Sequence, residues 1–371
     1  MAWFIGLMSG TSLDGVDGVL AEQPIGDGPM QARAHLHLPM PGALREDLLA
    51  LNRPGADELH LAALSANALS RLYARAVSAL ITAQGLQASD ITAVGAHGQT
   101  VRHRPREFDG TGYTLQLLNG ALLAELCGVD IVCDFRSRDL AAGGIGAPLV
   151  PAFHAACFGQ PGQDAAVLNL GGIANLTLLP DRGTVRGFDC GPGNLLMDLW
   201  CQRHQGQAYD SGGAWAAGGQ VDPALLQRLL DEPFFARQPP KSTGRDLFDA
   251  AWLGVRLQGS AAQPPDVMAT LAELTACSAA DALLRHAPAT RLLLVCGGGA
   301  FNAHLLKRIQ ASLGERVRLA STAEAGVPPD QVEALAFAWL ARAHVARQAG
   351  NLPAVTGARA GRVLGALYPA A

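Results

Sequence analysis

Three short apolar runs in this sequence end in glycine-rich turns that could bind phosphate. Glycine permits positive φ and close approach of the backbone, so consecutive peptide N–H groups can point at phosphate oxygens without a Cβ in the way. The three segments are Ile5–Ser12, Val167–Ile173 and Leu292–Gly299. Because they come from the beginning, the middle and the last quarter of the chain, we expect distant segments to converge on one phosphate-bearing ligand.

The first turn is polar and does not have the P-loop pattern. It lacks the lysine of GxxxxGK[ST], and it joins predicted strands at 3–8 and 16–22 instead of opening a helix. Its hydroxyl and N–H groups could hold terminal phosphates, and Asp14 or Asp17 could meet a metal-bound water. The alternative is an ordinary polar hairpin turn. The candidate phosphate-binding residues of this turn are Gly10, Thr11, Ser12, Leu13, Asp14, Gly15, Val16 and Asp17.

The later turns are Gly171-Gly172 and Gly297-Gly298-Gly299. The triple glycine follows an apolar run and precedes Asn302 and a predicted helix at 302–313. This order is typical of a nucleotide-binding crossover unit, in which a helix N-terminus faces a phosphate or ribose. A turn that serves only helix packing is the alternative. The GxGxxG spacing of dinucleotide-binding proteins is not met, which disfavours NAD.

Two carboxylates occupy positions where catalysis is conceivable. Asp189 stands at a strand end within Gly187–Asn194, just before a predicted helix at 195–202, and could act as a base. Helix capping is the alternative role, and we assign it to Asn194 instead. Glu333 lies in the first turn of a predicted helix at 330–348, where the helix dipole by itself favours a carboxylate.

Polar residues also follow the predicted strand at 91–96. His97, Gln99 and Thr100 form a neutral hydrogen-bonding group of the kind that contacts sugar hydroxyls or an acetamide, although an ordinary loop histidine is an equal alternative. The histidines of the chain show no HxxxH or HExxH spacing, so a zinc hydrolase is not supported. Asp134 and Arg136 follow a predicted strand at 130–133 and could simply pair with each other.

The elements that would position these residues alternate between strand and helix, which predicts an α/β fold. The Ala- and Leu-rich segment 59–84 predicts a long helix. Segment 139–151 is dense in Gly and Pro, so we place the crossing between two domains there. The predicted domains are 1–145 and 146–349, followed by a C-terminal segment, 350–371, that packs back on the first domain.

Composition excludes several classes of protein. The chain has 371 residues, of which 49% are apolar and 16% charged, as expected for a globular protein with substantial cores. A net charge of −4 without basic runs disfavours nucleic acid as a partner. Seven Cys without a CxxC pair favour reduced thiols and a cytoplasmic location. We find no signal peptide, and the apolar runs are too short for a membrane helix, so we expect a soluble protein with no membrane partner.

Five motifs in this order resemble the anhydro-N-acetylmuramic acid kinase family, within the sugar kinase, Hsp70 and actin superfamily. The motifs cover nearly the whole chain: Met8–Asp17, His97–Val101, Asp134–Arg136, Leu168–Asn175 and Gly187–Asn194. The resemblance implies an α/β, two-domain sugar kinase/Hsp70/actin-like (ribonuclease H-like) fold with a central interdomain cleft. It implies ATP-dependent conversion of 1,6-anhydro-N-acetylmuramic acid to N-acetylmuramic acid 6-phosphate in bacterial cell-wall recycling.

The resemblance also implies roles for individual residues. Asp189 takes a proton from water and Glu333 helps to hold that water. The first turn and Gly171-Gly172 hold phosphates, while Gly297-Gly298-Gly299 with Asn302 receives adenosine. The residues expected to contact the sugar are His97, Gln99, Thr100, Asp134, Arg136 and Asn175. Arg136 suits the lactyl carboxylate because its planar guanidinium binds carboxylates in a bidentate manner.

The expected cofactors are ATP and Mg²⁺, and the expected assembly is a homodimer. The wider superfamily has an Asp before the Gly-Thr of the first turn, where this chain has Leu7-Met8-Ser9, so the magnesium ligands are left open. Two alternatives remain at this stage. One is a kinase of a free hexose or amino sugar, and the other is a nucleotide-gated binder in the manner of Hsp70 or actin.

Overall fold

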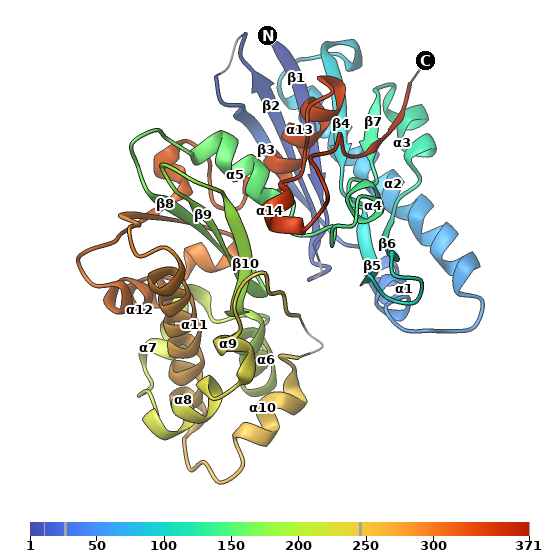
Figure 1. Ribbon diagram of the computed structural model, residues 1–371. Helices are drawn as coiled ribbons and strands as arrows, with labels where there is room; N and C mark the ends of the chain where they lie inside the picture. Colours follow the sequence, from blue (N-terminus) through green and yellow to red (C-terminus); the bar gives the residue numbers. More distant parts are fainter. Residues whose placement is uncertain (11, 26–27, 245–246, 371) are drawn as a thin grey trace. The chain divides into compact units, whose positions relative to one another are not determined.

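The computed structural model describes residues 1–10, 12–25, 28–244 and 247–370. The chain divides into two compact units, one formed by Met1–Cys157 with Gln331–Ala371 and the other by Phe158–Asp330. We call them unit 1 and unit 2 and describe each by itself (Figure 1).

Unit 1 is built on a sheet with strand order β13-β7-β4-β1-β2-β3. Its strands are β1 (Ala2–Met8), β2 (Gly15–Gln23), β3 (Gln31–Pro39), β4 (Ile91–Ala96), β7 (Ile131–Cys133) and β13 (Ala366–Tyr368). Strands β1, β2 and β3 form an antiparallel meander, whereas β4 pairs parallel with β1 and β7 pairs parallel with β4. A separate hairpin joins β5 (Gln99–Pro105) to β6 (Gly112–Leu117).

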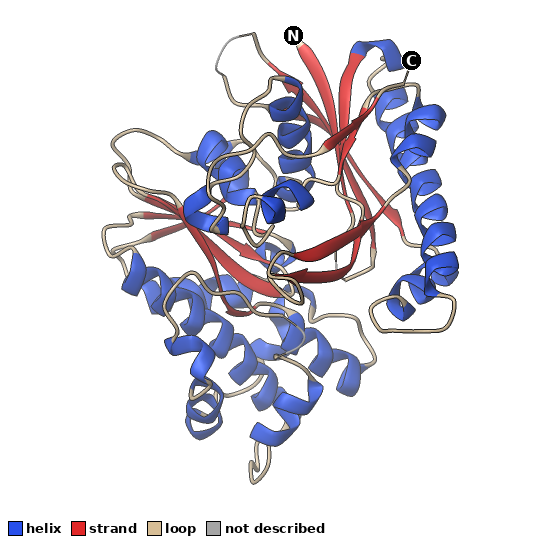
Figure 2. Ribbon diagram, turned by 45° about the vertical axis from the view of Figure 1, so that its right-hand side comes forward, coloured by secondary structure: helices blue, strands red, loops and turns tan. Residues whose placement is uncertain are grey.

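Helices cover the sheet of unit 1 (Figure 2). They are α1 (Gly42–Ala50), α2 (Glu58–Ala83), α3 (Gly120–Cys127), α4 (Ser137–Ala141), α13 (Val332–Val345) and α14 (Pro353–Thr356), with α5 (Val150–Phe158) ending at the unit boundary. The long helix predicted at 59–84 is therefore confirmed as α2. It packs Leu72, Val77 and Leu80 into the core beneath the sheet.

The structural division differs from the predicted boundaries at 145/146 and 349/350, because residues 146–157 and the segment that contains helix α13 both belong to unit 1. The helix lies directly on β1 and β4 at two paired glycines, Gly6 and Gly95. A Cβ on Gly6 would lie 1.8 Å from the carbonyl oxygen of Ala334, and one on Gly95 would lie 2.0 Å from that of Phe337. Such close helix–sheet contact depends on residues separated by more than two hundred positions, which local patterns do not reveal.

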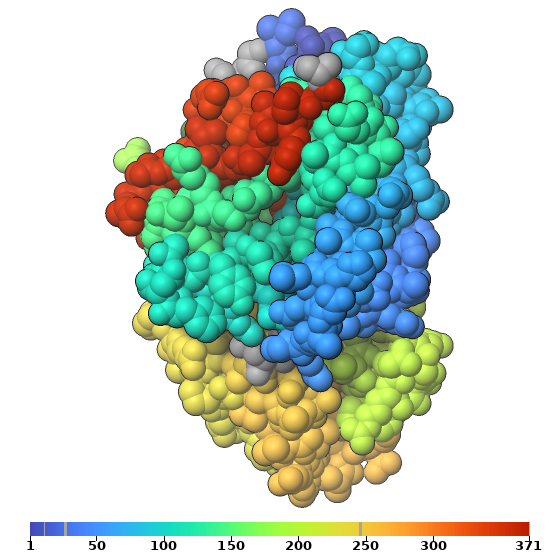
Figure 3. Space-filling model, turned by 90° about the vertical axis from the view of Figure 1, so that its right-hand side faces the viewer, coloured from blue at the N-terminus to red at the C-terminus, as the bar shows by residue number. Residues whose placement is uncertain are grey.

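The C-terminal segment adds the edge strand β13 to unit 1, antiparallel to β7. In Figure 3 the red C-terminal atoms lie beside the blue-green atoms around α3, and the Tyr368 ring covers Gly120 at the start of that helix. The buried carboxylate of Asp139 accepts hydrogen bonds from Asn351 Nδ2 (2.5 Å), the Thr356 hydroxyl (2.7 Å) and the Gly146 N–H (2.8 Å). The Gly- and Pro-rich segment after Asp139 is thus held by the end of the chain.

Unit 2 repeats the strand order of unit 1 without the added edge strand: β10-β9-β8-β11-β12. Its strands are β8 (Ala165–Leu170), β9 (Ile173–Leu179), β10 (Arg186–Pro192), β11 (Leu292–Cys296) and β12 (Arg318–Ser321). The first three are again an antiparallel meander and the last two run parallel to β8. Two units with this shared order have the ribonuclease H-like fold of the sugar kinase, Hsp70 and actin superfamily, as predicted.

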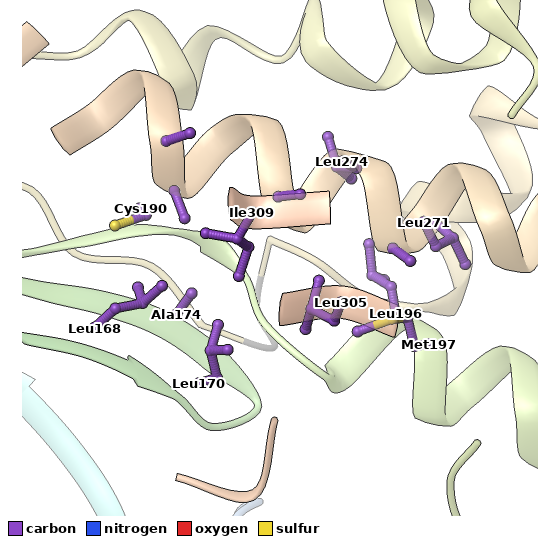
Figure 4. Close-up of a cluster of buried hydrophobic side chains, with 14 of the residues drawn as sticks. Leu168, Leu170, Ala174, Cys190, Leu196, Met197, Leu271, Leu274, Leu305 and Ile309 are labelled. Atoms are coloured by element: carbon purple, nitrogen blue, oxygen red, sulfur yellow. The ribbon is translucent and has the colours of Figure 1, made fainter. Parts of the chain in front are cut away.

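The helices of unit 2 are α6 (Leu195–Gln205), α7 (Ala214–Ala217), α8 (Pro223–Leu230), α9 (Pro233–Ala236), α10 (Ala250–Arg256), α11 (Pro264–His286) and α12 (Ala303–Leu313). Side chains of α6, α11 and α12 pack with those of β8 to β10 in a continuous apolar core (Figure 4). Within the described residues α11 has the length and composition of a membrane span, but 83% of its most apolar window is buried. Helix α11 therefore serves as the central core helix of unit 2.

Candidate functional site

The turn between β1 and β2 is compact and partly needed for packing. The Leu13 N–H donates to the Gly10 carbonyl at 3.3 Å, and Leu13 is buried with a φ of 56°. The Ser12 hydroxyl donates to Asp14 Oδ1 at 2.8 Å, whereas Thr11 lies outside the described residues. A Cβ on Gly15 would lie 2.4 Å from the Leu38 carbonyl oxygen. A Cβ on Gly10 would make only an ordinary contact, 3.7 Å from the Ser12 hydroxyl oxygen, so Gly10 is the glycine of this turn that a ligand could approach.

Asp17 is engaged by the neighbouring strand β3. Its Oδ1 lies 2.9 Å from His37 Nδ1 and 3.5 Å from His35 Nε2. Burial by itself would raise the pKa of Asp17, but the hydrogen bonds from His35 and His37 outweigh it and lower the pKa. Asp17, which we expected to lie near phosphate, therefore interacts with these two histidines.

Gln99 ties the end of β4 to the first turn. Its Oε1 accepts a short hydrogen bond from the Ser9 hydroxyl, and its Nε2 donates to the Gly10 carbonyl at 3.1 Å. Both side chains are almost completely buried. Gln99 thus supports the position of Gly10, and its amide is already bonded within the protein. The hydroxyl of Thr100, in turn, accepts from Gln116 Nε2 at 3.1 Å.

His97 and Arg136 form the polar centre of unit 1. Arg136 donates to His97 Nε2 from Nη2 at 2.9 Å and from Nε at 3.2 Å, and to the Gly146 carbonyl from Nη1 at 2.8 Å. Burial and the charge of Arg136 lower the pKa of His97 to about 3. The imidazole is therefore neutral and accepts at Nε2. The ring of Phe337, from α13, lies 4.8 Å from the imidazole and fixes its orientation.

Glu333 lies in the first turn of α13 and acts electrostatically on Arg136. Burial lowers the pKa of Arg136 to about 10, while the charges of Glu333 and Asp139 act in the opposite direction. The ion pair between Asp134 and Arg136 that we considered as an alternative is not the arrangement adopted. Asp134 is exposed, has a φ of 55°, and accepts from the Ser137 hydroxyl at 2.5 Å.

In unit 2 the two later glycine-rich turns lie next to each other. The carbonyls of Gly171 and Gly172 accept main-chain N–H groups of the segment 193–195 at 2.8–3.1 Å. A Cβ on Gly297 would lie 2.3 Å from Asn169 Oδ1, and one on Gly299 would lie 2.6 Å from the Leu170 Cβ. Packing therefore requires glycine at 297 and 299. A Cβ on Gly171, Gly172 or Gly298 would make only ordinary contacts, which leaves those backbones accessible to a ligand.

The asparagines of unit 2 have different roles from one another. Asn302 caps α12, its Oδ1 accepting from the Leu305 N–H at 2.9 Å. The prediction that Asn194 caps α6 is wrong, because its Nδ2 donates to the Leu170 carbonyl at 2.9 Å and its side chain makes no cap bond. Tertiary contact with the first glycine turn of unit 2 outweighs local capping. Asn175 lies on β9 directly opposite Asp189 of β10.

Asp189 combines partial exposure with a raised pKa. Burial raises the pKa of its carboxyl to about 6, while the Thr243 N–H and the charge of Lys241 act to lower it. The Thr243 N–H donates to Asp189 Oδ2 at 2.9 Å. A carboxylate whose pKa lies close to neutrality is suited to accept a proton and release it again.

Lys241 and Thr243 are residues that our sequence reasoning missed. They lie in an irregular segment, so neither strand nor helix periodicity marked them. One signal was present: only two of the 28 basic residues of the chain are lysine, namely Lys241 and Lys307.

The candidate site residues thus form one group in each unit. Unit 1 contains the first turn, His97, Gln99, Thr100, Asp134, Arg136 and Glu333, and unit 2 contains Asp189, Asn175, Asn302 and the later glycine turns. No group of three or more His, Cys, Asp or Glu side chains in the described ranges is arranged to hold a metal ion. A phosphate-borne Mg²⁺ needs only one or two carboxylates in addition to waters and phosphate oxygens. The exposed Asp14 fits that requirement better than Asp17, which is bonded to histidine.

Comparison with known proteins gives a match over almost the entire chain. The profile of the anhydro-N-acetylmuramic acid kinase family matches residues 2–370. An anhydro-N-acetylmuramic acid kinase of Variovorax paradoxus is 61% identical over 373 residues, covering 99% of both chains. One of Bordetella petrii is 62% identical over 371 residues, covering 99% of this chain and 96% of the relative. Among solved structures, a ROK family glucokinase from Streptomyces griseus with glucose and AMPPNP is 15% identical with a TM-score of 0.42, covering 92% of this chain and 99% of that chain.

Proposed function

This chain belongs to the anhydro-N-acetylmuramic acid kinase family, and on that premise we propose that it opens the 1,6-anhydro ring of 1,6-anhydro-N-acetylmuramic acid with water and phosphorylates O6 from ATP. The products are N-acetylmuramic acid 6-phosphate and ADP, which fits recycling of cell-wall sugars. The observation that carries this proposal is the match to the family profile over residues 2–370. Named relatives with 54–62% sequence identity support it. The same match does not favour the free-sugar kinase or the Hsp70-like binder.

Asp189 is the proposed general base. Its carboxyl has a pKa of about 6 because burial disfavours the charged form, so at neutral pH it is mostly ionised and still basic enough to take a proton from water. The water attacks C1 of the sugar while Asp189 accepts its proton, and Glu333 orients the same water. The C1–O6 bond then breaks and O6 leaves toward the γ-phosphoryl group.

Phosphoryl transfer removes the need for a general acid. The electron pair that O6 gains from the broken acetal bond forms the new bond to phosphorus, and the bond to the β-phosphate oxygen breaks to give ADP. Holding water, sugar and ATP in line lowers the barrier by on the order of 7–11 kcal/mol. Proton transfer accelerates the reaction by about 10²–10⁴-fold, which corresponds to roughly 3–5 kcal/mol and is therefore the smaller contribution. Positioning should therefore dominate the catalysis.

Arg136 is the proposed ligand of the lactyl carboxylate. Three of its five N–H donors are bonded to His97 and the Gly146 carbonyl, which fixes the guanidinium and leaves two donors for the sugar. His97, Thr100, Asp134 and Asn175 are proposed to contact the rest of the sugar, and Gln99 to act by holding Gly10.

ATP is proposed to bind through backbone N–H groups. The turn Gly10–Asp17 and Gly171-Gly172 would hold the phosphates, and Gly297-Gly298-Gly299 with Asn302 the adenosine. Of these backbones, those at Gly10, Gly171, Gly172 and Gly298 have room for a ligand. Mg²⁺ bound to the phosphates would neutralise their charge, with Asp14 as its protein-side carboxylate.

Cytoplasmic location and a homodimer complete the proposal. All seven cysteines are free thiols, which fits a reducing compartment. The dimer rests on family resemblance and is tested by light scattering on the purified protein.

The activity is tested by incubating the enzyme with ATP, Mg²⁺ and a panel of anhydro and free amino sugars, followed by mass spectrometry. We expect a product from anhydro-N-acetylmuramic acid that has gained both water and a phosphoryl group. Asp189→Asn should lower turnover by about 10²–10⁴-fold, the usual contribution of a general base, and leave ATP affinity near wild type. Wild-type turnover in this variant would remove Asp189 from the role of base.

A further inference from the structure

The segment Lys241–Thr243 forms hydrogen bonds with both the main chain and the side chain of Asp189. The Asp189 N–H donates to the Lys241 carbonyl at 3.1 Å, and the Thr243 N–H donates back to Asp189 Oδ2 at 2.9 Å. A main-chain donor directed at one carboxylate oxygen favours the ionised form and fixes the rotamer of the side chain. Asp189 is thus hydrogen-bonded to this segment in addition to being paired with Asn175 of the neighbouring strand.

The ammonium group of Lys241 is itself held in place. Its Nζ donates to the carbonyls of Phe234 and Phe235, each at 3.3 Å, and lies 4.6 Å from the centre of the Phe234 ring. These partners are uncharged, and the described part of the chain places no carboxylate in an ion pair with Lys241. Its field acts on Asp189, and the field of Asp189 acts on Lys241.

The choice of lysine at this position is unusual for this chain, in which all other basic residues except Lys307 are arginine. An ammonium group is a compact point charge with three donors, whereas a guanidinium spreads its charge over a planar fork. The Lys241 ammonium can therefore contact two carbonyl groups and an aromatic face, an arrangement that does not require a carboxylate partner.

We propose that Lys241–Thr243 is a positioning strap for Asp189, in which the main chain orients the carboxylate and the Lys241 ammonium keeps it ionised for proton transfer. This inference rests on the proposed function, because it assumes that Asp189 is the base. Lys241 and Thr243 are positioning residues in this scheme, since they act through Asp189.

Other titratable groups near the strap belong to β10, to the end of α9 and to α11. Cys190, next to Asp189 on β10, has a thiol whose pKa is raised by burial, so it stays neutral. Burial lowers the pKa of Lys241, and Arg285 at the end of α11 and Arg237 lower it further. Burial, and after it the charge of Lys241, also lowers the pKa of His286. Among the described residues, Lys241 is the cation whose charge acts on Asp189.

The first experiment measures the pH dependence of kcat/KM for the anhydro sugar. Its acid limb reports the pKa of the base in the free enzyme. Removing a nearby positive charge makes Asp189 harder to ionise, so Lys241→Met should move the acid limb upward by about 0.5–1 pH unit. Lys241→Arg keeps the charge and should stay close to wild type. Lys307→Met, which removes the other lysine at an exposed position of α12, is the matched control and should leave the profile unchanged.

The second experiment does not depend on activity. Reductive ¹³C-dimethylation keeps the charge of lysine and gives only two lysine signals in this chain, which Lys307→Arg assigns. The Lys241 signal should shift with an inflection at the pKa of Asp189, and this inflection should be absent in Asp189→Asn. An identical titration of this signal in both proteins overturns the strap.

The two experiments separate failure of the strap from failure of the proposed function. If Asp189→Asn is inactive but Lys241→Met keeps the wild-type pH profile, the strap is wrong and the base assignment stands. If Asp189→Asn keeps wild-type turnover, the base assignment is wrong, and the strap as a catalytic device falls with it.

Discussion

At the residue scale, the aspartates of this chain show how surroundings give one side chain different chemistry. Asp17 is bonded to two histidines and its pKa is lowered. Asp139 is fully buried and accepts three hydrogen bonds, which makes it a structural anchor. Asp189 is partly exposed with one main-chain donor and a pKa of about 6. Of these three, Asp189 is the one whose proton affinity matches acid–base work near neutrality.

The raised pKa of Asp189 predicts a cost in stability. Because the folded pKa of about 6 exceeds the ordinary aspartate value of 3.8, the folded state binds more protons between these values, and the free energy of unfolding falls as pH rises through this window. Asp189→Asn cannot ionise, so its free energy of unfolding should not show this decrease. One pKa unit corresponds to about 1.4 kcal/mol, and partial exposure screens part of the effect, so we expect the variant to be about 1–2 kcal/mol more stable at pH 8.

Urea unfolding at pH 8 and pH 4 checks this prediction. The stability difference between Asp189→Asn and wild type should be largest at pH 8 and close to zero at pH 4. A difference that is the same at both pH values would mean that ionisation of Asp189 costs the folded state nothing.

At the element scale, helix α13 connects the fold to the candidate site. Its first turn carries Glu333 and its next turn places Phe337 against His97. The helix reaches this position because Gly6 and Gly95 have no side chains where they face it. A contact between backbones thus sets the position of a proposed catalytic carboxylate.

Gly95→Ala should therefore displace α13. The new Cβ would lie 2.0 Å from the Phe337 carbonyl oxygen, and a backbone atom cannot move aside by changing a rotamer. We expect a loss of about 3–5 kcal/mol in unfolding free energy, at the upper end of single-residue effects, together with loss of turnover. Urea unfolding of the purified variant measures the loss.

Gly42→Ala is the matched control in the same unit. A Cβ at Gly42 meets no atom within 4 Å, so this variant should have nearly wild-type stability and activity. Equal stability of Gly95→Ala and Gly42→Ala would refute the direct contact of α13 with the sheet.

At the scale of the whole molecule, two units with the same strand order divide the candidate residues between them. Each unit has its own sheet and core, and each presents a glycine-rich turn after its first strand. The repeated order agrees with the similar beginnings of the two sequence halves. The pH dependence of stability, by contrast, is expected to come mainly from three histidines of unit 1.

Buried histidines predict how stability depends on pH. Burial lowers the pKa of His97 to about 3, that of His103 to about 4 and that of His154 to about 3. An unfolded histidine takes up its proton near pH 6.5, so the unfolded state binds more protons below that pH and the protein loses stability as pH falls from about 6.5 toward 4. Each histidine contributes a slope of up to about 1.4 kcal/mol per pH unit.

Asp189 has the opposite effect, because its raised pKa favours the folded state at low pH. It is a single group, whereas three histidines lower the stability as pH falls. Urea midpoints measured from pH 7.5 to 4.5 should therefore decrease, and His154→Gln should reduce the slope. A midpoint that stays constant over this range would show that these histidines are protonated in the folded protein.

The sequence by itself determined the family, the α/β class, most strands and helices, and the candidate base, because these depend on short motifs and on periodicity between neighbours in the chain. The tertiary structure decided which side chains remain available. Gln99 is bonded to Ser9 and Gly10, Asn194 to Leu170, and Asp189 to the Lys241–Thr243 strap. These partners are 24 to 90 positions apart, and only folding of the sheets brings them within hydrogen-bonding distance.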